Sequence, residues 1–167
     1  MKTLLVMRHG KSDWSADYGA DHDRPLNDRG ARSARVIGEV LTGRGLAPQL
    51  IISSTAERAR RTAEIAMESG GWDSKLVLEP LLYESGAEGV IEIAVSVAGV
   101  DRLLLVGHQP TWSTLVSALT GERVEMKTGT VVVIELDIGQ WSELATSRGR
   151  VAEVVRPRDH LDSADPD

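Results

Sequence analysis

The stretch Leu4-Leu5-Val6-Met7-Arg8-His9-Gly10-Lys11-Ser12 holds the features that decide the fold. A short apolar run that stops at Arg-His-Gly is typical of a buried strand whose carboxyl end delivers two polar side chains into a loop. Ligands of open α/β sheets bind outside such strand ends. Imidazole is a nucleophile at neutral pH, and guanidinium matches phosphate with a planar fork of donors. The stretch therefore predicts either phosphoryl chemistry or a strand end with two solvated polar residues.

The composition predicts one domain. The chain has 167 residues, of which 41% are hydrophobic and 26% charged, enough for a three-layer core. We expect the domain to span residues 1–156 and an acidic tail over 157–167 to be frayed. The absence of cysteine excludes disulfides and a thiolate nucleophile, and it fits a cytoplasmic location. No segment is long enough to span a membrane.

The net charge of −6 and the aromatic content of 4% argue against nucleic-acid binding. Any phosphate site must then be a local cluster of cations. The four histidines have no metal-ligand spacing, so we expect no metal and no other cofactor. We further expect a monomer.

Strand and helix patterns alternate along the chain. Apolar runs predict strands at 2–7, 49–53, 75–78, 102–106, 130–136 and 150–155, and helical spacing predicts helices at 28–42, 56–67, 87–98 and 111–119. This alternation is typical of an α/β fold with three α/β/α layers and a mostly parallel central sheet. The last two strands need not be parallel to the others. Residues 8–25 are expected to form a long loop, which is often functional.

Three of the predicted strands end in groups that can hold phosphate. The first leads to Arg8 and His9, the second through Ser54 to a helix carrying Arg58, and the third to His108. Parallel strands end at one edge of a sheet, so we expect these side chains to converge there. Rival chemistries lack support, since the chain has neither a nucleotide P-loop nor a dinucleotide G-x-G-x-x-G motif.

Four motifs in order resemble the histidine phosphatase superfamily, over roughly residues 1 to 135. They are Arg8-His9-Gly10, Arg24-Pro25-Leu26 with Gly30 and Ala34, Ser53-Ser54 with Arg58-Ala59 and Thr62-Ala63, and Val106-Gly107-His108. Lys11-Ser12 and the stretch Asp21–Leu26 are similar to the small SixA-like phosphohistidine phosphatases. The resemblance implies a phosphoglycerate mutase-like fold without the large helical lid of bigger relatives.

The resemblance also implies roles. His9 would be the nucleophile, Arg8 and Arg58 would hold the phosphoryl oxygens, and His108 would donate to another of them. Neighbouring cations lower an imidazole pKa from its ordinary value of about 6.5, so His9 should be neutral at pH 7. No metal is required, because the cations take its role.

Each assignment has a plainer alternative. Arg58 shares its helix with Arg60 and Arg61, any of which can be solvated surface, so the motif alone selects Arg58. His108 can equally be a hydrogen-bonded core histidine.

The long loop offers further candidates. Ser12 either contacts phosphate or closes the loop. Arg24 is expected to pin the loop to Asp21 or Asp23, and His22 to be exposed.

The proton donor is assigned to Glu84 because of its place between Arg58 and His108. A phosphomonoester needs an acid for its alkoxide leaving group, whereas a phosphohistidine has a better leaving group once its imidazole is protonated. Glu84 can equally cap the helix near Ala87.

These observations predict a metal-independent phosphatase with a phospho-His9 intermediate, acting on phosphohistidine in a protein. The alternatives are a phosphatase of a small phosphorylated metabolite, such as a sugar or nucleotide phosphate, and a phosphate-binding domain without turnover.

Overall fold

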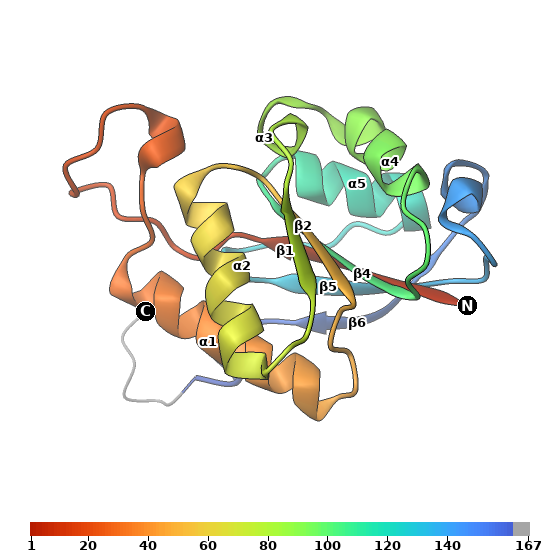
Figure 1. Ribbon diagram of the computed structural model, residues 1–167, viewed down its shortest axis with the longest axis horizontal. Helices are drawn as coiled ribbons and strands as arrows, with labels where there is room; N and C mark the ends of the chain where they lie inside the picture. The colour runs from red at the N-terminus through yellow and green to blue at the C-terminus, as the bar shows by residue number, and fades with distance from the viewer. Residues whose placement is uncertain (162–167) are drawn as a thin grey trace.

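A computed structural model describes residues 1–161, and its centre is one six-stranded sheet (Figure 1). The strands are β1 (Lys2–Arg8), β2 (Leu50–Ser53), β3 (Lys75–Leu78), β4 (Arg102–Gly107), β5 (Val131–Leu136) and β6 (Arg150–Val155), in the order β3-β2-β4-β1-β5-β6. The pairs β3–β2, β2–β4 and β4–β1 are parallel, and the pairs β1–β5 and β5–β6 are antiparallel. The predicted mostly parallel sheet is confirmed, and β1, β2 and β4 end at one edge.

Helices cover both faces of this sheet (Figure 1). They are α1 (Asp28–Gly43), α2 (Glu57–Gly70), α3 (Leu81–Glu84), α4 (Ala87–Val95) and α5 (Thr111–Thr120), with 3-10 turns η1 (Asp21–Asp23), η2 (Trp141–Thr146) and η3 (Pro157–Asp159). One core packs α1 and α2 on the sheet, and the other packs α4, α5 and η2. Neighbouring residues on β1 alternate between the cores, as the strand period of two requires.

Local sequence explains where the first two helices begin. Asn27 caps α1 by accepting a hydrogen bond from the Gly30 amide at 2.8 Å. Neither Ser54 nor Thr55 caps α2. Its cap position is Ala56, whose amide donates instead to the Ser54 hydroxyl.

The structure differs from the sequence prediction in several short segments. The helix expected at 87–98 ends at Val95, and the loop at 8–25 includes η1. The expected frayed tail begins instead with η3, because its Pro157 is buried and lies against Gly129. Residues 162–167 of that tail lie outside the described residues. Between α2 and β4 the structure holds only β3, α3 and α4, so this region forms no large helical lid.

Among residues 1–161, no helix is both long and apolar enough to cross a membrane.

Gly30 brings the start of α1 against the loop after β1. A Cβ on Gly30 would overlap the backbone carbonyl of Lys11, which has no room to move. We expect Gly30→Ala to lower the free energy of unfolding by about 1–3 kcal/mol, measured by urea denaturation. Gly43→Ala at the other end of α1 is the control, since its Cβ meets nothing within 4 Å. Equal stability of the two variants would contradict the tight approach.

Candidate active site

The carboxyl end of β1 presents His9 in a fixed tautomer. His9 Nδ1 lies 2.6 Å from the carbonyl oxygen of Gly10. A carbonyl can only accept, so Nδ1 carries the ring proton and Nε2 keeps its lone pair. The Gly10 amide in turn donates to the Thr62 hydroxyl of α2 at 3.0 Å, which holds this loop in place.

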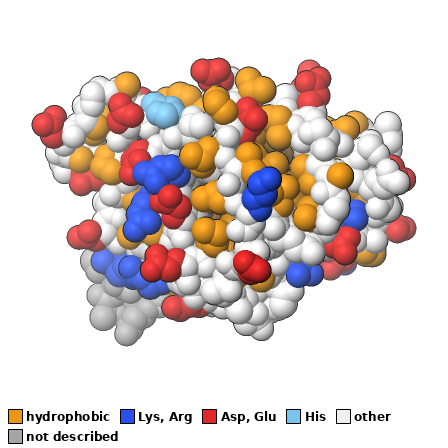
Figure 2. Space-filling view, in the orientation of Figure 1, with side chains coloured by type: hydrophobic (Ala, Val, Ile, Leu, Met, Phe, Trp, Pro, Cys, Tyr) orange, Lys and Arg blue, Asp and Glu red, His pale blue; other side chains and the backbone are white. Residues whose placement is uncertain are grey.

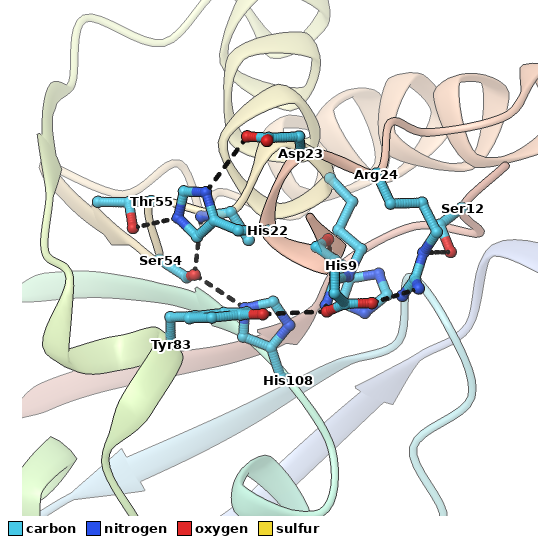
Figure 3. Close-up of polar contacts among 12 residues, drawn as sticks. His9, Ser12, His22, Asp23, Arg24, Ser54, Thr55, Tyr83 and His108 are labelled. Atoms are coloured by element: carbon cyan, nitrogen blue, oxygen red, sulfur yellow. Dashed lines mark hydrogen bonds and ion pairs between the residues drawn. The ribbon is translucent and has the colours of Figure 1, made fainter. Parts of the chain in front are cut away.

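The ends of β2 and β4 bring His108 beside His9, with ring centroids 5.2 Å apart (Figure 3). His108 Nε2 lies 2.8 Å from the Ser54 hydroxyl. That oxygen already accepts from the Ala56 amide, so its own proton is available to His108 Nε2. When the Ser54 hydroxyl donates to Nε2 in this way, the ring proton of His108 lies on Nδ1. The sequence prediction that these strand ends converge is confirmed.

A cavity of about 340 Å³ lies at this edge of the sheet. It is lined by Arg8, His9, Lys11, Ser12, Trp14, Arg24, Arg58, His108, Gln109 and Thr128. Three buried atoms of its lining side chains, Arg8 Nε, Arg58 Nε and His108 Nδ1, have no hydrogen-bond partner in the part of the chain that the structure describes. Unpaired buried polar atoms are costly, and all three belong to side chains that line this cavity, which is typical of a site for an anion.

Burial keeps both imidazoles uncharged. It lowers the pKa of His9 to about 4, and the charges of Arg58, Arg8 and Arg24 act in the same direction against the hydrogen bond to Gly10. Burial likewise lowers the pKa of His108 to about 3, helped by His9 and Arg58. His9 is therefore neutral at pH 7, as the sequence analysis expected, although burial rather than the neighbouring cations is the main cause.

One carboxylate from the long loop, Asp21, bridges two arginines. Its oxygens accept from Arg24 Nη1 at 2.6 Å and from Arg58 Nη2 at 3.0 Å. The Tyr83 hydroxyl donates to the same carboxylate at 3.0 Å. Partial burial raises the pKa of Asp21, but Tyr83 and the two arginines outweigh it, so the net pKa is lowered and the group is ionised.

The loop residues behave partly as expected. Arg24 does pin the loop to Asp21, and its Nε also donates to Ser12 at 3.0 Å. Ser12 is buried, lines the cavity and closes the loop through a bridge to Leu26. His22 is only half-exposed and lies 2.7 Å from the Thr55 hydroxyl, so the expectation of an exposed side chain was wrong.

The structure does not bring Glu84 to this cavity. Glu84 is exposed at the end of α3 and is not among the cavity-lining residues. Its neighbour Tyr83 reaches inward instead, edge-on to His108 with ring centroids 5.4 Å apart (Figure 3). The sequence analysis named Asp21 only as a possible partner of Arg24, and it missed Tyr83 and the bridge from Asp21 to Arg58.

Chemically, the arrangement pairs a neutral imidazole, whose Nε2 keeps its lone pair, with fixed positive charge. The residues described form no cluster of three or more His, Asp or Glu side chains that could hold a metal. Arg8, Arg58 and His108 instead supply donors around His9, which is the environment that phosphoryl transfer requires.

Buried neutral imidazoles have a measurable signature. We expect the ring proton resonances of His9 and His108 to stay flat from pH 8 to pH 5.5 and to move only near pH 4 and below. Histidine variants at these two positions assign the signals in a nuclear magnetic resonance titration. A midpoint near 6.5 for either ring would contradict the burial argument.

Comparison with known proteins agrees with this geometry. A family model of the histidine phosphatase superfamily (branch 1) matches residues 4–90. Uncharacterized protein ML1117 of Mycobacterium leprae is 32% identical over 165 residues, which cover 91% of this chain and 100% of that protein.

The solved structure of SixA from Nakamurella multipartitia is similar with a TM-score of 0.84 and 26% identity, covering 93% of this chain and 96% of the other. SixA from Agrobacterium tumefaciens gives 0.81 and 26%, covering 93% and 98%. The chain belongs to the histidine phosphatase superfamily, and its fold is that of the SixA-like members.

Proposed function

We propose that this protein is a metal-independent phosphatase that works through a phospho-His9 intermediate, with phosphohistidine in a protein as its substrate. One observation carries the proposal. A buried, neutral His9 with a free Nε2 shares a cavity with three buried donors that lack partners in the described part of the chain. An anion receptor needs no such nucleophile, so the alternative of phosphate binding without turnover has less support.

The reaction proceeds in two transfers. His9 Nε2 attacks phosphorus while the bond to the leaving group breaks, and the phosphoryl group becomes bonded to Nε2. The Gly10 carbonyl stabilises the cationic ring through the Nδ1 proton. Arg8, Arg58 and His108 surround the three transferring oxygens with donors. Water then cleaves the phosphorus–nitrogen bond, releasing phosphate and restoring neutral His9.

We choose phosphohistidine as the substrate because the cavity lining has no carboxylic acid to protonate a leaving group. None of the cavity-lining residues is a carboxylic acid, Glu84 lies outside the cavity, and Asp21 is held ionised by two arginines. An alkoxide leaving group would lack a proton donor here. A phosphohistidine whose ring already carries a proton on its other nitrogen needs no such acid, because the P–N bond electrons go to that ring and it leaves as neutral imidazole, a far weaker base than an alkoxide.

The rim of the cavity also favours a protein substrate. Trp14 lines the cavity, is 72% exposed and stacks on the Arg24 guanidinium at 3.5 Å. Exposed tryptophan next to arginine is typical of protein-binding surfaces. Without a helical lid, a phosphorylated side chain on another protein can reach His9. The two SixA structures that this chain resembles are named putative phosphohistidine phosphatases, and these names support the same choice.

The covalent intermediate is directly testable. During turnover of a ³²P-labelled phosphohistidine substrate, acid-labile and base-stable label should appear on the protein. In His9→Ala it should be absent, and kcat should fall at least about 1,000-fold. His160→Ala is the control and should keep both label and rate. EDTA should leave the wild-type rate unchanged. Normal turnover by His9→Ala would disprove the mechanism.

The lack of a carboxylic acid in the cavity lining predicts which substrates are hydrolysed more efficiently. We expect kcat/KM to be much higher for a phosphohistidine peptide than for an alkyl phosphomonoester. Glu84→Gln should change neither value by more than about twofold, as should the neighbouring control Glu88→Gln. A selective loss of monoester activity in Glu84→Gln would instead make Glu84 the acid and favour a small phosphomonoester as the substrate.

A further inference from the structure

A second cavity, here called the basic cavity, lies next to the catalytic one and has a volume of about 420 Å³. It is lined by Lys11, Arg29, Ser33, Lys127, Thr128, Thr130, Arg156, Pro157 and Arg158. Lys11 and Thr128 line both cavities, so the two share a wall. Five of the nine lining residues are cations and none is acidic.

This concentration of positive charge is unusual for the molecule. The protein carries a net charge of −6, and on the face drawn in Figure 2 the basic side chains over α1 and α2 lie next to acidic ones. Arg60 on α2, for example, pairs with Glu57 and Glu64. Within the described residues 1–161, Lys127 and Arg158 form no ion pair that would neutralise their charge.

The lining of the basic cavity also includes a buried polar atom, the hydroxyl oxygen of Thr130. Thr130 lines it and is fully buried, and its hydroxyl oxygen has no hydrogen-bond partner within residues 1–161. A hydroxyl can donate to an anionic oxygen, and an unsatisfied buried hydroxyl costs free energy until it does so. The cations that line the basic cavity offer the donor set that a carboxylate or phosphate accepts, and Thr130 adds an unsatisfied hydroxyl beneath them.

The wall between the cavities is rigidly tied to the catalytic strand end. The Gly129 amide donates to the carbonyls of both Arg8 and His9, at 3.1 and 2.9 Å. The Arg8 guanidinium donates to the Met126 carbonyl at 3.0 Å. Pro157 packs on Gly129 and so brings its flanking arginines to this wall. The fold thus fixes the basic cavity relative to His9, as a substrate subsite requires.

We infer that the basic cavity binds a second anionic group of the substrate, a carboxylate or a phosphate carried on the same molecule as the phosphoryl group. In a phosphohistidine protein this group would be an acidic side chain near the phosphohistidine. The inference rests on the proposed function and adds a selectivity to it. The catalytic cavity selects the phosphoryl group, and the basic cavity selects the substrate that bears it.

The test compares matched substrates that differ only in the second charge. One arm uses phosphohistidine peptides with a single Glu placed at successive positions around the phosphohistidine, against the same peptides with Gln. The other arm uses small phosphomonoesters with and without a carboxylate. We expect the wild type to prefer the anionic member in one arm roughly five- to tenfold in KM, and that arm identifies the source of the group.

Two double variants separate the basic cavity from general electrostatics. Lys127→Gln with Arg158→Gln should abolish the preference through KM, with kcat and the neutral substrates unchanged. Lys75→Gln with Arg123→Gln removes the same charge from exposed positions outside both cavities and should keep the preference. No preference in the wild type, or its loss in both double variants, would overturn the inference.

A binding measurement keeps this result distinct from a failure of the proposed function. Calorimetric titration with phosphonocarboxylates of increasing length, against alkyl phosphonates of equal length, requires no turnover. One outcome is that no substrate is hydrolysed, but the carboxylate still strengthens binding only when Lys127 and Arg158 are present. That outcome would support the basic cavity as an anion subsite and disprove the proposed phosphatase activity. If the carboxylate adds nothing at any length, the basic cavity is not an anion subsite.

Discussion

The chemistry of this site depends on burial that keeps two imidazoles neutral among guanidinium groups. His9 could not attack phosphorus as an imidazolium, and two charged rings with centroids 5.2 Å apart would repel one another and the neighbouring arginines. The strand ends impose the burial, because β1 and β4 lie side by side in the sheet interior. Burial destabilises the protonated rings, so the fold itself favours the neutral form that the proposed reaction needs.

The neutral histidines add no positive charge to the site. Its three buried or half-buried arginines, Arg8, Arg24 and Arg58, are charged and repel one another. Asp21 offsets part of this charge by bridging Arg24 and Arg58 through its two carboxylate oxygens. Its side chain is half exposed, so it is tied to the site without being enclosed by it. Arg8 has no such carboxylate and instead donates to a backbone carbonyl. The site therefore retains positive charge for a phosphoryl group while avoiding an uncompensated cluster.

The sequence predicted the parts of this arrangement that follow from local rules. Apolar runs located the strands, and the rule that parallel strands share an edge brought His9, Arg58 and His108 together. Local rules could not choose Arg58 over Arg60, because both lie in the first turns of α2 and only packing buries one of them; the family resemblance made that choice.

The sequence analysis could not predict the contact between Asp21 and Tyr83 for a related reason. They lie 62 positions apart, on segments with one helical turn each, where neither periodicity nor length gives a signal. Their meeting depends on how the long loop folds back across α2, which only tertiary packing decides. Glu84 shows the same limit, because one residue of register in a four-residue helix separates an inward side chain from an exposed one.

The antiparallel strand β5 explains how a chain without a helical lid can still hold its catalytic strand end firmly. β5 runs antiparallel to β1, so the segment that precedes β5 lies at the carboxyl end of β1. Had β5 been parallel, that segment would lie at the other end of β1. That segment supplies the Gly129 amide to the Arg8 and His9 carbonyls and the Met126 carbonyl to the Arg8 side chain. Gly129 has a φ of 79°, which glycine adopts without strain. The reversal of strand direction, in a region without any of the family motifs quoted above, thus fixes the two residues on which the proposed reaction depends.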